Sequence, residues 1–310
     1  MDSPDPGAGR RRTGLAAGRG DSNGGGVSAL PVRRLSAALG AEVLEVDLTH
    51  DLDDGTIATM RAALADFCVL LFRGQSLTPS QHIEFTKRFG ALQELTLASY
   101  LHEDHPEIFV VSNKSVDGKP SDTRRTGRRW HTDMCYTSQP CRGALLYALE
   151  VPTVGGDTVF ANMQHAYNGL SDGMRTIIEG LRTVHDLSKL ADFKNRDPKS
   201  TAKIVADNPP VEHPLVWTHP DSGRKSLFLS DQIAYRITGM SEAESRPILD
   251  YLLGQATRIE NTYRHQWLAG DLVFWDNRSV MHFAPEDYDM SDPTNVRYMH
   301  RTTLAGPPVS

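Results

Sequence analysis

The sequence has few cysteines and no long apolar segment. Its 310 residues include only Cys68, Cys135 and Cys141, and a small, odd set of cysteines does not form the disulfide framework of a secreted protein. No apolar run approaches the roughly 18 residues that cross a bilayer. We therefore expect a protein of the reducing cytoplasm that does not enter a membrane.

The sequence also lacks an excess of basic residues. Lys and Arg number 33 against 39 Asp and Glu, which gives a net charge of −6, whereas a nucleic-acid binder would show a basic balance or a basic stripe. With 39% hydrophobic and 23% charged residues, the composition is that of an ordinary globular protein with a sizeable core. The composition favours a small-molecule ligand over nucleic acid, and it leaves assembly into a homo-oligomer open.

The first 26 residues have almost nothing to bury. They contain eight glycines and two prolines, so they cannot offset the entropy that is lost on ordering. Arg10 to Arg12 are not followed by the apolar segment of an export signal. We predict a disordered tail over residues 1–26 and a single folded domain over residues 27–310.

Short apolar runs between turn residues dominate the rest of the chain. They predict strands over residues 32–35, 42–47, 69–72, 108–111, 143–149, 157–161, 182–185, 214–218, 226–230, 259–263, 271–275 and 296–304. Helical spacing and capping signals predict helices over residues 53–67, 78–89, 171–180 and 241–253. The pattern is typical of a mainly β sandwich, barrel or jelly roll with flanking helices. Polar segments over residues 117–129 and 187–211 are interpreted as lids or surface excursions.

The segment Trp130-His131-Thr132-Asp133 offers an imidazole and a carboxylate two residues apart. It has the character of a strand, and side chains at i and i+2 leave a strand on the same face. His131 and Asp133 can therefore converge on one metal ion. They are two thirds of the 2-His-1-carboxylate triad of non-haem Fe(II) oxygenases, and His282 is the candidate for the third ligand.

The same spacing occurs at His102 and Asp104, in a polar stretch that ends in His105-Pro106. This stretch is typical of a loop, which would not hold the two side chains on one side. We interpret it as solvated. The basic residues over 124–129 are interpreted equally as a solvated loop or as an electrostatic funnel for an anionic substrate.

Arg297 and Arg301 lie four residues apart on the last predicted strand and so share a face. A guanidinium binds a carboxylate through a bidentate fork and keeps its charge, so an inward arginine demands an anionic partner. The rise per residue places the two Cα atoms about 13 Å apart, and one anion cannot easily satisfy both. We therefore expect the two arginines to serve two different anionic ligands.

A series of landmarks along the chain resembles one known family. In order they are Leu71-Phe72-Arg73-Gly74-Gln75, Trp130-His131-Thr132-Asp133, Gly155-Gly156-Asp157-Thr158, Asn208-Pro209-Pro210, His213-Pro214, Thr218-His219-Pro220, Ser222-Gly223, Trp275-Asp276-Asn277-Arg278 and Met299-His300-Arg301. Together they resemble the taurine and 2,4-dichlorophenoxyacetate dioxygenases, over residues 40–306. The resemblance implies a double-stranded β-helix (jelly roll) core, Fe(II), and a hydroxylation in which 2-oxoglutarate and O2 become succinate and CO2.

The resemblance also implies roles for single residues. His131, Asp133 and His282 match the iron ligands of the family. Thr158 and Arg297 match the residues that hold the distal carboxylate of 2-oxoglutarate. Asp133 favours hydroxylation over halogenation, because the related halogenases lack this carboxylate.

For the primary substrate the resemblance implies an anion. Arg301 matches an arginine that meets the substrate's sulfonate in taurine-type enzymes, and Met134 and Tyr100 are further candidates for the substrate pocket. The chain departs from the taurine enzymes after Phe89-Gly90, where residues 93–96 include no counterpart of a substrate-contacting His. A sulfonate, sulfate, phosphonate or carboxylate therefore stays open as the substrate.

Two other classes of protein fit the same residues. Zn(II) also accepts a His-Asp-His site with an open position, as in a metal-dependent hydrolase that would turn over without oxygen. A non-catalytic jelly-roll binding protein would bind its ligand without consuming 2-oxoglutarate.

Overall fold

The computed structural model describes residues 30–94, 100–114, 123, 127–190 and 198–306. The tail predicted over residues 1–26 lies outside the described residues, as do most of the loop predicted over residues 117–129 and residues 191–197 of the second predicted excursion. No helix in the described part of the chain is long and apolar enough to cross a membrane.

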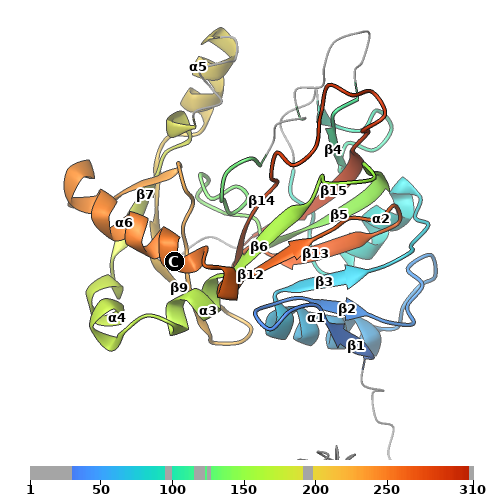
Figure 1. Cartoon of the computed structure of the whole chain (residues 1–310), viewed down its shortest axis with the longest axis horizontal. Coiled ribbons are helices and arrows are strands. Elements are labelled where there is room, and N and C mark those ends of the chain that lie inside the picture. The colour runs from blue at the N-terminus through green and yellow to red at the C-terminus, as the bar shows by residue number, and fades with distance from the viewer. Residues whose placement is uncertain (1–29, 95–99, 115–122, 124–126, 191–197, 307–310) are drawn as a thin grey trace, which may run out of the picture.

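The largest sheet has seven strands in the order β1-β2-β3-β13-β5-β15-β4 (Figure 1). Only β2 and β3 pair in parallel; the other neighbours are antiparallel. Two strands from the C-terminal part of the chain therefore flank β5 in the middle of the sheet. The strands are β1 (Val32–Arg34), β2 (Ala41–Val43), β3 (Val69–Phe72), β4 (Phe109–Ser112), β5 (Gly143–Glu150), β13 (Leu272–Asp276) and β15 (Tyr298–Leu304).

Three smaller antiparallel sheets complete the strand framework. The sheet that faces the large one has the order β12 (Thr262–His265), β6 (Thr158–Asn162) and β14 (Val280–Phe283). The others are β11 (Ala234–Ile237), β7 (Arg182–His185) and β8 (Val211–Pro214), and the pair β10 (Lys225–Leu227) and β9 (Val216–Thr218).

Helices flank the sheets, as predicted (Figure 1). Side-chain caps fix where several begin: Asp53 accepts the Thr56 N–H, and Thr78 and Ser241 form capping boxes. The helices are α1 (Asp54–Phe67), α2 (Pro79–Lys87), α3 (Met163–Asn168), α4 (Asp172–Ile178), α5 (Pro198–Asp207) and α6 (Glu242–Ala256), with 3₁₀ turns η3 (Leu187–Lys189) and η5 (Ile259–Asn261).

The two faces of the large sheet bury different layers, because successive side chains of a strand point to opposite faces. Leu70 and Phe72 of β3 pack in one cluster with apolar side chains of α1 and α2. Val69 and Leu71 of the same strand pack in another cluster with Phe160 of β6. The candidate site lies against this second, inner layer.

Several predicted boundaries are wrong. The strand predicted over residues 42–47 ends at Val43, because Glu45 takes a left-handed backbone conformation with φ 58°. Residues 259–261 form η5, so the strand predicted there begins only at Thr262. Strands β11 and β14 and helices α3 and α5 were not predicted; α5 lies inside the segment that we interpreted as a polar excursion.

Candidate metal centre and cosubstrate pocket

Three side chains from distant segments converge beside the inner layer. The ligand atoms of His131, Asp133 and His282 all lie within 4.8 Å of one another, and no other such group of metal-binding side chains occurs in the part of the chain that the structure describes. His131 Nε2 is 3.6 Å from Asp133 Oδ1, and His282 Nε2 is 3.8 Å from Asp133 Oδ2. Asp133 and His282 are buried while the His131 side chain is 20% exposed, so the group is accessible from the His131 side.

The strand predicted over Trp130 to Asp133 is wrong. Only His131 pairs like a strand residue: its N–H donates to the His282 carbonyl at 3.0 Å, and the His282 N–H donates to the His131 carbonyl at 2.9 Å. The chain then turns, with Met134 in the left-handed region at φ 54° and the Thr137 N–H donating to its carbonyl at 3.0 Å. The turn satisfies backbone groups locally, and it brings Asp133 to the side of His131.

Both imidazoles turn Nε2 toward Asp133. His131 Nδ1 lies 2.7 Å from the Arg129 carbonyl; because a carbonyl only accepts, Nδ1 is the donor in this bond, and Nε2 is the nitrogen that can bind a metal. The His282 ring lies 4.9 Å from the Trp275 ring and stacks at 5.9 Å on Phe160. Burial lowers the pKa of His282 to about 3, and the neighbouring His131 adds to the effect. A neutral imidazole is the form that binds a metal.

Asp133 has a cationic neighbour inside the protein. Arg301 Nη1 donates to Asp133 Oδ1 at 3.1 Å, and the guanidinium lies 4.7 Å over the Phe109 ring. Burial opposes the charged form of Asp133, but Arg301 and the two histidines outweigh it and hold the pKa of this carboxyl below its ordinary value. Arg301 therefore faces inward, as predicted. The turn gives Arg301 an internal partner in Asp133, and its role toward a substrate anion stays a prediction.

The group of three fits a divalent metal ion. Asp133 Oδ2 is buried and has no hydrogen-bond partner among the described residues, so a cation would satisfy an oxygen that the protein leaves unpaired. Two neutral nitrogens and one carboxylate oxygen also form the donor set of the 2-His-1-carboxylate triad.

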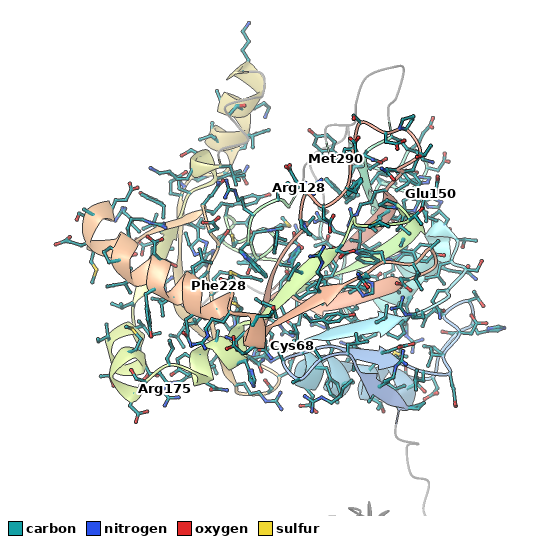
Figure 2. All side chains as sticks on the ribbon, viewed as in Figure 1. Cys68, Arg128, Glu150, Arg175, Phe228 and Met290 are labelled. Carbon is teal, nitrogen blue, oxygen red and sulfur yellow. The ribbon has the colours of Figure 1, made fainter. Side chains whose placement is uncertain are left out.

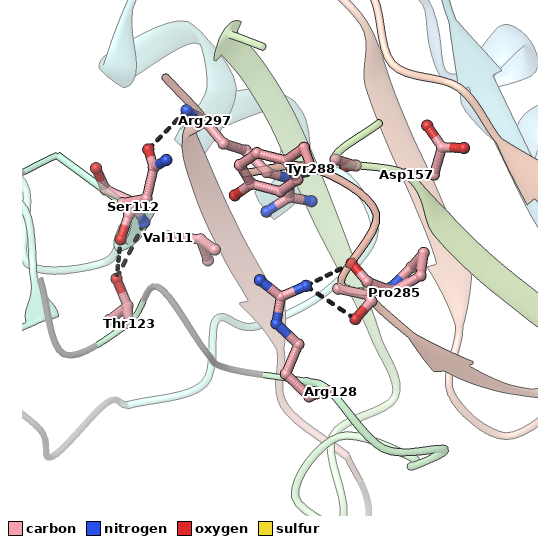
Figure 3. Close-up of a pocket in the computed structure, with 11 residues that line it drawn as sticks. Val111, Ser112, Thr123, Arg128, Asp157, Pro285, Tyr288 and Arg297 are labelled. Atoms are coloured by element: carbon pink, nitrogen blue, oxygen red, sulfur yellow. Dashed lines mark hydrogen bonds between the residues drawn. The ribbon is translucent and has the colours of Figure 1, made fainter. Parts of the chain in front are cut away.

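Arg297 lines a separate pocket (Figure 3). Its Nε donates to the Gly156 carbonyl at 2.9 Å, while its two terminal nitrogens have no acceptor among the described residues. Burial lowers its pKa to about 10, so the group stays charged at neutral pH. Tyr288 and Asp157 line the same pocket. A buried guanidinium with unpaired terminal donors fits a carboxylate ligand.

Thr158 lies two residues after Gly156, whose carbonyl accepts from Arg297, but Thr158 does not line the Arg297 pocket. It is buried on β6 two residues before Phe160, so both side chains face the inner layer. Its Oγ1 accepts the Trp267 Nε1–H at 3.0 Å. The hydroxyl proton is still available to donate to a bound carboxylate.

The two further candidates for the substrate pocket, Tyr100 and Met134, are linked to Arg301 through Phe109 and Asp133. The Tyr100 and Phe109 rings pack edge to face with their centroids 5.7 Å apart, and the Arg301 guanidinium lies over the Phe109 ring. Met134 is partly exposed and directly follows Asp133. These positions are compatible with the predicted roles.

His102 and Asp104 lie in a loop, as predicted. The Asp104 N–H donates to His102 Nδ1 at 3.2 Å, and the His102 ring packs 5.2 Å from His300. The imidazole nitrogen is thus used within the loop, and the pair forms no metal group.

Sequence reasoning missed the role of Arg128, which we had grouped with a basic loop. Its Nη1 donates to the carbonyls of Ala284, at 3.2 Å, and Pro285 (Figure 3). Its Nη2 lies 3.0 Å from the sulfur of Met290, and both residues are labelled in Figure 2. Arg128 therefore ties the segment before His131 to the segment after His282. The motif spacing carries no signal for such a contact between distant segments.

The chain is similar to several known proteins. The family model described as taurine catabolism dioxygenase TauD, TfdA family matches residues 31–303. An alpha-ketoglutarate-dependent 2,4-dichlorophenoxyacetate dioxygenase of Cupriavidus pinatubonensis is 36% identical over 90% of this chain and 98% of its own. An alpha-ketoglutarate-dependent sulfate ester dioxygenase of Pseudomonas putida is 34% identical over 89% and 90%. The crystal structure of AAD-2 in complex with Mn(II) and N-oxalylglycine has a TM-score of 0.80 at 32% identity and covers 91% of this chain and 100% of that chain.

Proposed function

The chain belongs to the TauD, TfdA family of dioxygenases, and we propose that it hydroxylates a small anionic organic molecule at an Fe(II) ion held by His131, Asp133 and His282. The observation that carries the metal assignment is the convergence of these three ligand atoms within 4.8 Å. The enzyme is an oxidoreductase that uses 2-oxoglutarate and O2 as cosubstrates. Neither a zinc hydrolase nor a non-catalytic binding protein is supported by these relatives.

The protein's part in the reaction is to hold and orient the reactants. Bound Fe(II) supplies the redox chemistry by which O2 and 2-oxoglutarate are consumed while a substrate C–H bond is oxidised. His131 and His282 would each bind the metal through a ring nitrogen and Asp133 through its carboxylate, a ligand set that would leave open positions for the cosubstrates. The aromatic rings that pack on buried His282 would keep water away from a metal ion on that side.

Arg297 and Thr158 hold the distal carboxylate of 2-oxoglutarate in this proposal. The support is the buried Arg297 guanidinium, whose terminal nitrogens find no acceptor among the described residues. An unpaired buried charge is costly, and a carboxylate offsets that cost with two parallel hydrogen bonds. The Thr158 hydroxyl adds one donor on the same side of β6 as the inner layer.

The fold that we infer is a double-stranded β-helix. Its support is the pair of facing sheets, with β13, β5 and β15 in one and β12, β6 and β14 in the other, together with the similarity to solved family members. In this arrangement the two histidines and Asp133 lie between the sheets.

The substrate that we propose carries one negative charge close to Arg301. The relatives named above act on a phenoxyacetate and on sulfate esters, and both kinds of molecule are anions. Arg301 uses Nη1 for Asp133, while its buried Nε has no partner among the described residues. The Phe109 ring lies under this guanidinium and the Tyr100 ring packs against Phe109.

A substrate panel tests the proposal. Sulfonates, alkyl sulfates, phosphonates and aryloxyalkanoates are each incubated with the enzyme, Fe(II) and 2-oxoglutarate under air, and substrate-dependent succinate is measured. Neutral amide analogues serve as matched controls. We expect succinate to rise with at least one anion and not with its neutral analogue. Turnover without O2, or a preference for neutral compounds, would contradict the proposal.

A further inference from the structure

A second cavity, of about 310 Å³, lies at the end of strands β13 and β15. Arg297 lies near the opposite end of β15. Its wall includes Phe274, Asp276 and Leu304, where β13 and β15 end and β5 begins. Arg297 precedes the other end of β15, where Tyr298 pairs with Glu150. The cavity is therefore separate from the Arg297 pocket, with which it shares no lining residue.

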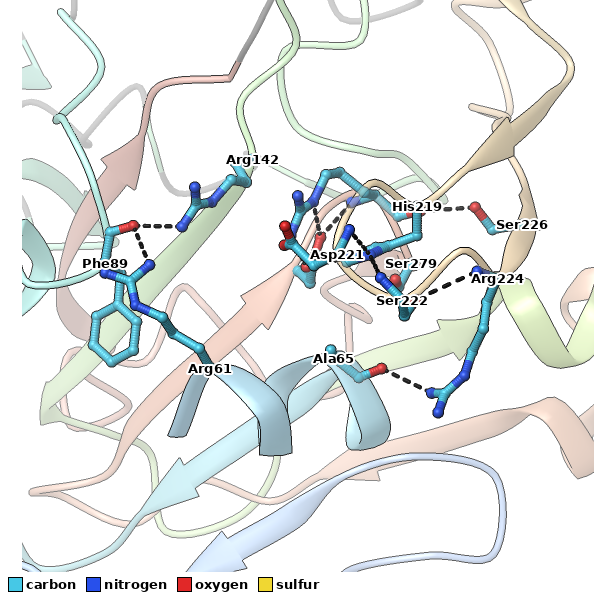
Figure 4. Close-up of polar contacts among 12 residues, drawn as sticks. Arg61, Ala65, Phe89, Arg142, His219, Asp221, Ser222, Arg224, Ser226 and Ser279 are labelled. Atoms are coloured by element: carbon cyan, nitrogen blue, oxygen red, sulfur yellow. Dashed lines mark hydrogen bonds and ion pairs between the residues drawn. The ribbon is translucent and has the colours of Figure 1, made fainter. Parts of the chain in front are cut away.

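Two arginines on one side of this cavity share a single acceptor (Figure 4). Arg61 of α1 donates from Nη1 to the Phe89 carbonyl at 2.9 Å and from Nη2 to the Arg88 carbonyl, and Arg142 donates from Nη2 to the same Phe89 carbonyl. Neither forms an ion pair with a carboxylate in the described part of the chain. Since a guanidinium has five N–H donors, most of those on Arg142 remain available.

The two carboxylates that line the cavity pair with a third arginine, Arg278. Asp276 accepts from Arg278 Nε at 2.9 Å and Nη2 at 2.6 Å, and also lies 3.0 Å from His219 Nε2. Asp221 pairs with the same Arg278 at 3.0 Å. Arg278 thus has two carboxylates, whereas the hydrogen-bond acceptors of Arg61 and Arg142 among the described residues are main-chain carbonyls. Arg61 also lies 5.2 Å over the Phe89 ring.

The positive groups also disfavour one another. Burial lowers the pKa of Arg142 below its ordinary value, and Arg278 and Arg61 add to the effect because like charges repel. An anion placed between Arg61 and Arg142 would remove this repulsion and satisfy the unpaired donors.

We propose that this cavity is a binding site for a small oxyanion of the phosphate or carboxylate type, held by Arg61 and Arg142. The forked donors of arginine match the geometry of both anions. Occupation would link α1, the end of α2 and the start of β5, since Arg61, Phe89 and Arg142 come from those segments. The site is independent of the catalytic proposal.

The test uses the full chain without metal, titrated calorimetrically with inorganic phosphate and, separately, with malonate. Ala62→Glu places a carboxylate in the cavity from an exposed position of α1, without removing either arginine or its carbonyl contacts. Ala243→Glu makes the same charge change at an exposed position of α6. We expect saturable binding of at least one anion, a dissociation constant raised at least tenfold by Ala62→Glu, and no change in Ala243→Glu.

A second pair of variants separates this cavity from the Arg297 pocket. Arg142→Gln should also weaken binding at least tenfold, whereas Arg297→Ala should leave it unchanged. The proposal is overturned by the absence of saturable binding of both anions, or by equal binding in Ala62→Glu and Ala243→Glu. It is likewise overturned if binding is lost in Arg297→Ala and kept in Ala62→Glu, since the anion would then occupy the catalytic pocket.

Discussion

Arg301 pairs with the metal-ligand candidate Asp133 and is assigned to the substrate anion. Replacing it therefore tests two roles, one in substrate binding and one beside the metal position. In Arg301→Ala the substrate anion loses its cationic partner. A hydrogen bond to a charged group contributes about 1.5–3 kcal/mol, which corresponds to a factor of about 10 to 150. We expect the Michaelis constant for the best anionic substrate to rise by roughly that factor, while the 2-oxoglutarate requirement, assigned to Arg297, stays nearly constant.

The same variant should behave differently with and without metal. Removing one partner of a buried ion pair costs about 3–5 kcal/mol. The lower end applies here, because 15% of the Arg301 side chain is exposed. A metal ion at Asp133 replaces the lost positive charge, so Mn(II) should raise the melting temperature of Arg301→Ala more than that of the unmodified protein. Mn(II) affinity should not fall, since a like-charged neighbour of the metal has been removed.

The assays are succinate formation at varied substrate and at varied 2-oxoglutarate, and calorimetric titration with Mn(II). Arg73→Ala is the matched control: it removes a guanidinium that lies 2.7 Å from buried Asp271 rather than from a metal-ligand candidate, and should lower stability without changing the Michaelis constant for the substrate. Arg301→Lys should restore part of the substrate affinity, because a point charge replaces a fork. An equal rise in the Michaelis constants for the substrate and for 2-oxoglutarate, or a large loss of Mn(II) affinity, would refute this assignment of Arg301.

Three further predictions concern other residues. Alanine at any of the three metal-ligand candidates should abolish succinate formation and the visible charge-transfer band that Fe(II) and 2-oxoglutarate give together under anaerobic conditions; retention of the band in the triple variant would show that the metal lies elsewhere. Arg297→Ala should weaken 2-oxoglutarate binding by about 2–5 kcal/mol and Thr158→Val by about 1–3 kcal/mol, and calorimetry should detect little change in substrate affinity. Burial lowers the pKa of His82 to about 3, so the unfolded chain binds a proton between pH 6.5 and 3 that the folded chain does not, and stability falls as the pH drops through that window. The free energy of unfolding, measured with urea at pH 6.5 and 5, should depend less on pH in His82→Gln, by up to about 1.4 kcal/mol per pH unit. An unchanged pH dependence would exclude His82 as its source.

Most of the large sheet was predictable from short-range patterns. The apolar runs of β3, β5 and β13 are continuous because both faces of these strands are buried. Strand β14 was missed although it carries His282, because it follows directly after a turn and includes a histidine within a short apolar run. Its pairing with β6 joins residues far apart in the chain, and no local pattern encodes such a contact.

The candidate site shows the same division between residue type and geometry. Resemblance and donor chemistry singled out His131, Asp133 and His282, but the strand rule used to place the first two fails in the structure. Their convergence depends on the reciprocal backbone hydrogen bonds between His131 and His282 and on the turn at Met134. That turn directs Asp133 toward Arg301 as well. On a regular strand, the i and i+2 spacing would bring Asp133 beside His131 but not beside Arg301. The turn lets this one carboxylate face two histidines and one guanidinium. The negative charge of Asp133 is therefore shared between the metal position and Arg301, which couples the metal to the residue that we assign to the substrate.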